Sequence, residues 1–137
     1  MSVSLRYLLD TNIISNLIRQ PDGAVVRKIA EVGEDSICTS IIVAAELRYG
    51  AEKSGSKPLS ERVELLLSAL EILPLAPPAD RLYAVIRNQL AGLGTPIGPN
   101  DLLIAAHALA ADLTLVSANT REFKRIPSLR IENWLGV

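Results

Sequence analysis

The chain has 137 residues, a formal net charge of -1 and a hydrophobic fraction of 49%, which together indicate one globular domain and exclude a disordered or repetitive chain. Its 14 basic and 15 acidic residues exclude a protein that holds nucleic acid through bulk positive charge, so a nucleic-acid role would require a local site. The single cysteine, Cys38, excludes an internal disulfide and a cysteine-rich zinc site.

The cellular location is predicted from segments that the sequence lacks. The first residues do not form a basic region followed by a long apolar stretch, so no signal peptide is expected. The longest apolar run, residues 102–111, contains His107 and is too short to span a bilayer. These features and the lone cysteine predict a cytoplasmic protein that does not enter a membrane.

Short apolar segments alternate with helical periodicity in the first half of the chain. Ser40 is expected to cap the helix after the second strand, and the sequence Pro21-Asp22-Gly23 is expected to end the first helix. The expected elements are strands at residues 6–9 and 36–39 and helices at about residues 11–18, 25–30 and 41–53.

The same alternation continues in the second half. Residues 54–58 are expected to form a loop, and Asp80 and Asn100 are expected to cap two later helices. The expected elements are strands at residues 71–75, 113–116 and 130–133 and helices at residues 60–70, 79–93 and 100–111. This alternation predicts a three-layer α/β/α fold, in which helices cover both faces of a short, mainly parallel sheet of four to five strands.

Four acidic residues follow the predicted strands. Asp10 directly follows the first strand, and Glu46 lies in the second turn after another. Asp101 opens an apolar helix, and Glu122 comes just past the strand at residues 113–116. Ligands of parallel α/β sheets bind outside the carboxyl ends of the strands, so these acids are expected at one edge. Each also has an ordinary structural explanation, such as a helix cap, an exposed helix position or a favourable charge at a helix N-terminus.

The set is more informative than any of its members. Three or four converging carboxylates repel one another and require cations. Ligation by oxygen alone suits Mg²⁺ or Mn²⁺, and such a site can activate water and offset the charge of a phosphodiester. His107, the only histidine, lies about 120° around its helix from Asp101, so we expect it in the core rather than among the ligands.

Several stretches of the chain, taken in order, match one known family. They are LLDTNI at residues 8–13, AELRYGA at 45–51, GPND with IAAHA at 98–108, and LVSANTREF at 115–123, followed by ENW at 132–134. With these stretches the chain resembles the PIN-domain ribonucleases, most closely the VapC-type toxins of bacterial toxin–antitoxin pairs.

The resemblance implies a single PIN-like domain over residues 1–137 that acts as a metal-dependent endoribonuclease toxin. It implies that Asp10, Glu46 and Asp101 form an acidic core that holds Mg²⁺ or Mn²⁺. It implies an RNA substrate, with initiator transfer RNA and ribosomal RNA as the candidates. It also implies a cognate VapB-type antitoxin and a homodimer that meets DNA only through that antitoxin.

The resemblance also bears on the fourth acid and on the residues around it. Many PIN domains have Asp where this chain has Asn119, and the VapC-like pattern offers Glu122 instead, so Glu122 is expected to complete the catalytic set. Ser117 stands where relatives often have Thr, and it keeps the hydroxyl. Asn12, Ser117 and Asn119 are expected to position ligands or substrate, with Arg121 as a further contact.

Basic residues follow the last of these stretches. Arg121, Lys124, Arg125 and Arg130 are expected to cluster around Glu122. Beside a metal site they would hold the RNA backbone, because phosphate contacts position a strand without reading its sequence. A solvated turn is the ordinary alternative for such a cluster.

Two further hypotheses concern partners. The antitoxin is expected to insert basic residues near Asp10 and Asp101 and to dock on apolar helices at residues 13–18 and 25–29. The alternative function is a non-catalytic interaction module that keeps the fold and works by binding a partner. Loss of Asp10 or Asp101 would favour that alternative, and the chain has both acids.

Overall fold

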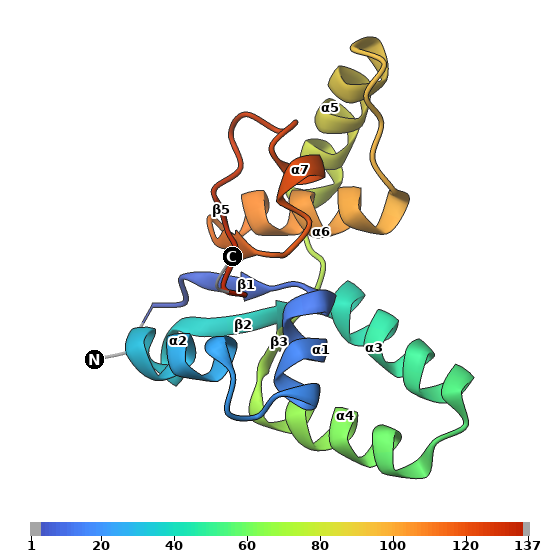
Figure 1. Cartoon of the computed structure of the whole chain (residues 1–137). Coiled ribbons are helices and arrows are strands. Elements are labelled where there is room, and N and C mark those ends of the chain that lie inside the picture. Colours follow the sequence, from blue (N-terminus) through green and yellow to red (C-terminus); the bar gives the residue numbers. More distant parts are fainter. Residues whose placement is uncertain (1–3, 136–137) are drawn as a thin grey trace.

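Five parallel strands form the centre of the computed structural model, which describes residues 4–135 (Figure 1). The strands are β1 (Tyr7–Leu9), β2 (Ile37–Ser40), β3 (Glu71–Leu73), β4 (Thr114–Val116) and β5 (Ile131–Glu132). Their order across the sheet is β3-β2-β1-β4-β5, and every neighbouring pair is parallel. The predicted α/β fold with a short parallel sheet is therefore confirmed.

Helices cover both faces of the sheet, as predicted. Figure 1 shows α1 to α4 below the sheet and α5 to α7 above it. The helices are α1 (Thr11–Arg19), α2 (Ala24–Val32), α3 (Ile41–Ser54), α4 (Lys57–Ala69), α5 (Ala79–Gly92), α6 (Pro99–Ala110) and α7 (Thr120–Phe123), and a 3-10 turn, η1 (Glu34–Ser36), precedes β2. Within residues 4–135, every helix is too short or too polar to cross a lipid bilayer.

The strand order brings the ends of β1 and β4 side by side. β2 and β3 lie on one side of β1 and β4 and β5 lie on the other, so the order reverses direction between β1 and β4. At such a switch point the loops after two adjacent strands diverge and leave a crevice for ligands. The backbone N–H of Asp10 donates to the carbonyl oxygen of Val116 at 2.9 Å. The pairing of β1 with β4 therefore extends to Asp10 itself.

An aliphatic core surrounds β1. All three residues of β1 are buried, and Leu8 and Leu9 are fully enclosed. Enclosing one leucine side chain stabilises a fold by about 2 kcal/mol. Trp134 closes the core at one end, where its ring meets that of Tyr7 edge to face at a centroid distance of 5.0 Å. The strand that directly precedes Asp10 is therefore enclosed by the core.

The apolar stripes of α1 and α2 face this core. Ile13, Ile14, Val25 and Ile29 are buried in it. The expectation that these stripes form docking surfaces for an antitoxin is therefore wrong for these four residues. Their burial instead fixes α1 and α2 against the sheet.

The loop predicted at residues 54–58 is shorter in the structure, because α4 begins at Lys57 and not at residue 60. The hydroxyl of Ser56 accepts a hydrogen bond from Leu59 N at 3.2 Å and thereby caps the helix. Pro58 suits the first turn of a helix, where its missing N–H has no partner to lose.

Asn100 and Asp80 are not the helix caps that the sequence predicts. Gly98 occupies the N-cap position of α6 and Pro99 its first turn, so Asn100 lies inside the helix. In α5, Pro78 is at the N-cap position and Asp80 is an exposed residue of the first turn. In both helices a proline lies at or directly after the N-cap, so the residue predicted as the cap falls inside the first turn. The fixed φ angle of Pro99 suits the first position of a helix. The Asn100 side chain is thereby free to contact another element.

Candidate active site

Asp10 is the most buried acid of the site, with 3% of its surface exposed. Its Oδ1 accepts a hydrogen bond from Thr11 N at 2.8 Å, and its Oδ2 accepts one from Ser117 Oγ at 2.7 Å. Burial raises the pKa of Asp10, and the bonds from Ser117 and Thr11 partly offset this rise by stabilising the charged form. Asp10 is also the N-cap of α1. The helix-cap role that the sequence offered for Asp10 is therefore confirmed, and it is compatible with the place of this residue in the site.

Ser117 and Asn12 tie the loop after β4 to the start of α1. Ser117 is fully buried, and its hydroxyl accepts from Asn119 N at 2.9 Å while it donates to Asp10. Asn12 Oδ1 accepts from Ala118 N at 3.0 Å, and its Nδ2 lies 3.4 Å from Ser117 Oγ. The two predicted positioning residues thus occupy one network around the Asp10 carboxylate.

Asp101 lies in the first turn of α6 and faces the other acids. Burial and, after it, the charges of Asp10, Glu122 and Glu46, in that order of importance, together raise its pKa to about 6. Asn119 Nδ2 donates a hydrogen bond to Asp101 Oδ2 at 3.0 Å and opposes this rise. The structure therefore brings the four predicted acids close enough for their charges to interact.

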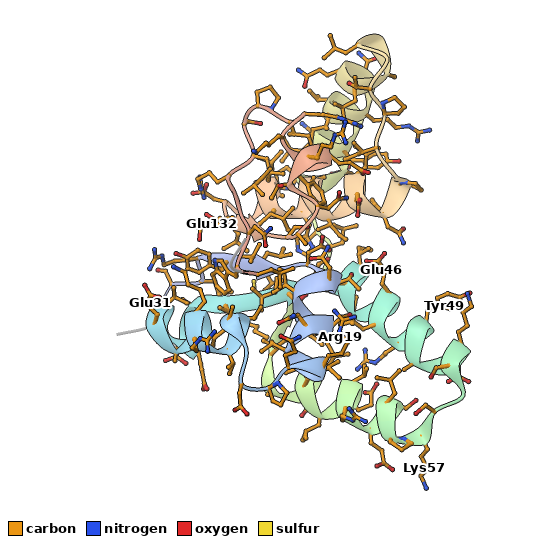
Figure 2. All side chains as sticks on the ribbon, in the orientation of Figure 1. Arg19, Glu31, Glu46, Tyr49, Lys57 and Glu132 are labelled. Atoms are coloured by element: carbon orange, nitrogen blue, oxygen red, sulfur yellow. The ribbon has the colours of Figure 1, made fainter. Side chains whose placement is uncertain are left out.

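Glu46 lies in the second turn of α3, near the start of that helix (Figure 2). Its Oε1 accepts a hydrogen bond from Thr11 Oγ1 at 2.6 Å, and its Oε2 accepts one from Asn100 Nδ2 at 3.4 Å. Sequence reasoning did not predict either partner. Thr11 could have been found from its position directly after Asp10, whereas Asn100 was assigned to a helix cap. Glu46 is thus half-buried and hydrogen-bonded, unlike an ordinary exposed helix residue.

The site carries negative charge without a paired cation. Among residues 4–135, no Lys, Arg or His side chain forms an ion pair with any of the four acids. As these side chains stand, the same part of the chain contains no group of three or more His, Cys, Asp or Glu residues that could hold a metal ion between them. The donors are oxygen atoms of carboxylates, hydroxyls and amides, which is the donor set that Mg²⁺ and Mn²⁺ prefer.

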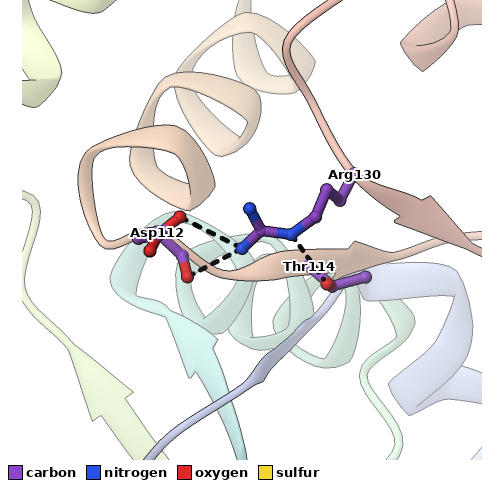
Figure 3. Close-up of polar contacts among 3 residues, drawn as sticks. All are labelled: Asp112, Thr114 and Arg130. Carbon is purple, nitrogen blue, oxygen red and sulfur yellow. Dashed lines mark hydrogen bonds and ion pairs between the residues drawn. The ribbon is translucent and has the colours of Figure 1, made fainter.

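The predicted basic cluster is only partly present. Arg130 turns toward the start of β4, where its Nη2 contacts Asp112 Oδ1 at 3.1 Å and its Nε lies 3.4 Å from Thr114 Oγ1 (Figure 3). The prediction for Arg130 is wrong, because the chain returns from α7 to the amino end of the sheet before β5 begins. Arg125 donates to the carbonyl oxygen of Pro96 at 3.2 Å.

The other two basic residues of the predicted cluster lie close to Glu122 in the sequence. Arg121 is exposed on α7 directly before Glu122, and Lys124 is exposed directly after that helix. Glu122 is half-buried on the same helix, and its charge raises the pKa of Asp101. Two cations therefore remain as candidates for holding a phosphate backbone beside the acidic site.

Comparison with known proteins adds to this geometry. The family model described as PIN domain matches residues 7–129. The chain belongs to the PIN-domain family. Its similarity extends over almost the full length of named relatives. It is 42% identical to "Ribonuclease VapC2" of Rickettsia felis over 93% of this chain and 97% of that protein. It is 40% identical to "tRNA(fMet)-specific endonuclease VapC" of Salmonella typhimurium over 95% of this chain and 98% of that protein.

Solved structures of the PIN-domain family agree with the fold of this chain. The toxin–antitoxin complex VapBC2 from Rickettsia felis, bound to a DNA fragment from its promoter, contains a chain that superposes with a TM-score of 0.89 at 39% identity. DNA-bound VapBC from Salmonella typhimurium contains one with a TM-score of 0.85 at 38% identity. These similarities cover 95% of this PIN-domain chain and 99% and 98% of the two matched chains.

Proposed function

We propose that this PIN-domain protein is a VapC-type endoribonuclease toxin that depends on Mg²⁺ or Mn²⁺ and is neutralised by a VapB-type antitoxin. The observation that carries the proposal is the convergence, at the carboxyl edge of the sheet, of four acids that have no ion-pair partner among residues 4–135. Burial and, after it, the charges of the other three acids raise the pKa of Asp101 to about 6. The ribonuclease names of relatives at about 40% identity support the same activity.

Asp10, Asp101 and Glu46 are the residues proposed to hold the metal, with Glu122 as the fourth acid of the catalytic set. A bound Mg²⁺ or Mn²⁺ would lower the pKa of water and offset negative charge on the phosphodiester. The reaction that this chemistry supports is hydrolysis, in which a water oxygen attacks phosphorus and the bond to the leaving oxygen breaks.

The protein residues orient the acids for that reaction. Thr11 N and Ser117 Oγ fix both oxygens of Asp10 and favour its charged form. Thr11 Oγ1 directs one oxygen of Glu46, and Asn119 Nδ2 directs one oxygen of Asp101. The second oxygen of Asp101 and the Glu122 carboxylate have no side-chain hydrogen bond within residues 4–135, so they are free to face a ligand.

The proposed substrate is RNA, and initiator transfer RNA is the first candidate because two relatives bear the name tRNA(fMet)-specific endonuclease. Arg121 and Lys124 are proposed to hold backbone phosphates next to the acids. Such contacts position the strand, whereas selection among RNAs would require contacts to bases or to RNA shape.

The proposed antitoxin would approach along a groove that starts at the acids. This groove has a volume of ≈ 310 Å³ and runs from Thr11 and Glu46 between α1, α3 and α4, with Ile18, Leu47 and Leu59 in its lining. An apolar segment of the antitoxin could occupy its far part while an arginine reaches the carboxylates, because the guanidinium fork matches a carboxylate. A homodimer of the toxin remains a prediction, which light scattering of the purified chain tests.

The decisive experiment for this function is a cleavage assay with initiator transfer RNA. Elongator methionine transfer RNA serves as the matched substrate control, and Asp101→Asn serves as the matched protein control. We expect cleavage of the initiator in Mg²⁺, little cleavage of the elongator, and none in EDTA or with the variant. Cleavage that persists in EDTA would contradict the metal role. Failure to cleave any RNA by a protein that still binds Mn²⁺ would favour the non-catalytic module.

A further inference from the structure

A buried hydrogen bond joins the helix that carries Asp101 to the start of the helix that carries Glu46. His107 of α6 is 3% exposed, and its Nδ1 lies 2.7 Å from Oγ of Ser40. Ser40 is fully buried, ends β2 and caps α3 by accepting a hydrogen bond from Ile42 N at 3.1 Å. His107 thus occupies the core, as predicted, but it has a specific partner across the sheet edge.

The surroundings of the bond favour one protonation state. Ser40 Oγ accepts from Ile42 N and keeps one proton and one further lone pair, so it can donate to His107 Nδ1 or accept from it, according to the tautomer of the ring. Burial lowers the pKa of His107 and therefore favours the neutral ring. A broken bond would leave polar atoms without partners in an apolar setting, so the bond resists displacement.

The two partners of this bond stand at equal distances in sequence from the acids. Ser40 precedes Glu46 by six residues, and His107 follows Asp101 by six residues. Six helical residues correspond to about 9 Å along a helix axis. The bond therefore does not contact the acids, and it affects their positions only through the placement of α3 and α6. Within residues 4–135, the other side-chain hydrogen bond between α3 and α6 runs from Asn100 Nδ2 to Glu46 Oε2, and it is long at 3.4 Å and exposed.

The small apolar residues of α3 and α6 do not fix how the two helices are placed against each other. Ala44 in α3 and Ala105, Ala106 and Ala108 in α6 are fully buried, small and apolar. Apolar burial is non-directional, so it draws helices together without fixing how one is shifted against the other. A hydrogen bond depends on distance and angle, so it selects one arrangement.

We propose that His107 is a positioning residue for the cleavage reaction. Its bond to Ser40 fixes α6 against the start of α3 and so holds Asp101 at the separation from Glu46 that a shared cation and the reacting phosphate require. This inference rests on the proposed function and adds a residue that touches neither metal nor RNA.

The test compares three variants of the full chain. His107→Leu removes the nitrogen that bonds Ser40, whereas His107→Asn places an amide group near the former Nδ1 that can still accept from Ser40 or donate to it. Ile104→Val is the matched packing control, because it removes one methyl group from a fully buried side chain of α6 without removing a hydrogen bond. The measurements are kcat and KM for RNA cleavage and the Kd for Mn²⁺ by electron paramagnetic resonance, with circular dichroism to verify folding.

We expect His107→Leu to lower kcat about tenfold and to weaken Mn²⁺ binding by a similar factor, with KM for RNA within about twofold. His107→Asn and Ile104→Val should stay within about threefold of the wild type in all three quantities. A folded His107→Leu with wild-type kcat and wild-type Mn²⁺ affinity would overturn the proposal.

A second variant covers the case in which His107→Leu does not fold. Ser40→Ala keeps the imidazole and removes its partner, so it must show the same losses in kcat and Mn²⁺ affinity, and wild-type values would overturn the proposal. The Mn²⁺ measurement also separates this inference from the function on which it rests. If the wild type binds Mn²⁺ but cleaves no RNA, the proposed function fails, and the Mn²⁺ affinities still decide the role of His107.

Discussion

The two sides of the acidic site are held in different ways. On the side of β1, Asp10 is almost fully buried, and both of its carboxylate oxygens accept hydrogen bonds from Thr11 and Ser117. On the side of α6 and α7, Asp101 accepts one side-chain bond, and Glu122 accepts none within residues 4–135. The first side is therefore fixed by the fold, whereas the second is governed by charge and should respond to a cation.

The largest contrast is expected between two neutralising substitutions of the acids. Asp101→Asn should abolish detectable cleavage while leaving the metal-free protein as stable as the wild type or more stable, because it removes repulsion. Asp10→Asn should abolish cleavage and also lower stability by about 1–3 kcal/mol, because an amide cannot accept both bonds. Thermal melting in EDTA measures the difference.

A clear loss of stability in Asp101→Asn would mean that this acid chiefly supports the start of α6. Equal stability losses in the two variants would remove the distinction between the two sides. The pH dependence offers an internal control. Since the folded-state pKa of Asp101 is raised to about 6, the wild type should gain stability relative to Asp101→Asn as pH falls from 7 to 5.

The residues at the end of β4 should rank next in effect. Glu122→Gln removes a charge from the site and should lower kcat by about 10- to 100-fold. Asn119→Ala removes an uncharged partner of Asp101 and should lower kcat less, by about threefold to tenfold. Both are measured at saturating Mg²⁺. If Glu122→Gln cleaves at the wild-type rate, the site has three acids and Glu122 is only a neighbour of the basic residues.

Ser117→Ala should affect stability more than Asn119→Ala does. The hydroxyl of Ser117 serves Asp10 and Asn119 at once, so its removal leaves buried groups without partners and should cost about 1–3 kcal/mol. Urea unfolding of the metal-free protein measures this cost. Ser68→Ala is the matched control, because Ser68 is exposed on α4 and bonds only the backbone of Leu65. Equal effects of both serine variants would refute the network.

The smallest effect is expected from the basic residues. Arg121→Ala should raise KM for RNA by about threefold and reduce its salt dependence, with kcat almost unchanged, since one phosphate contact is lost. Arg130→Ala makes the same charge change at the opposite end of β4, where an exposed ion pair contributes little. It should leave KM unchanged. Equal KM shifts in the two variants would point to bulk charge instead of a local contact.

The position of the acids at one edge can be predicted from the sequence, because parallel pairing places the carboxyl ends of adjacent strands side by side. Asp10 follows β1 and Glu122 lies shortly after β4, and parallel pairing of adjacent strands brings such residues to one edge. Periodicity also predicts most of the helices, including the Ser40 cap of α3. The strand ends therefore predict the place of the four acids, whereas Ser117 was predicted from the resemblance to PIN-domain ribonucleases.

The remaining details depend on how elements cross in space. The bond from Thr11 to Glu46 requires the crossing of α1 and α3, which no local pattern specifies. The role of Asn100 was hidden because Asn favours helix caps, whereas Gly98 takes that position. Arg130 was misplaced because sequence distance from Glu122 does not reveal the return of the chain to the opposite end of the sheet.

The central claim is that the four acids form one cation site in which Asp101 holds a proton that the metal displaces. Calorimetric titration of Mn²⁺ into the metal-free protein at pH 6, repeated in buffers of different ionisation enthalpy, measures both binding and proton release. We predict saturable binding with release of about half a proton in the wild type, because the pKa of Asp101 is raised to about 6. Asp101→Asn should show weaker binding without that proton. Saturable binding with equal proton release in both proteins, or no binding by the wild type, would contradict the account.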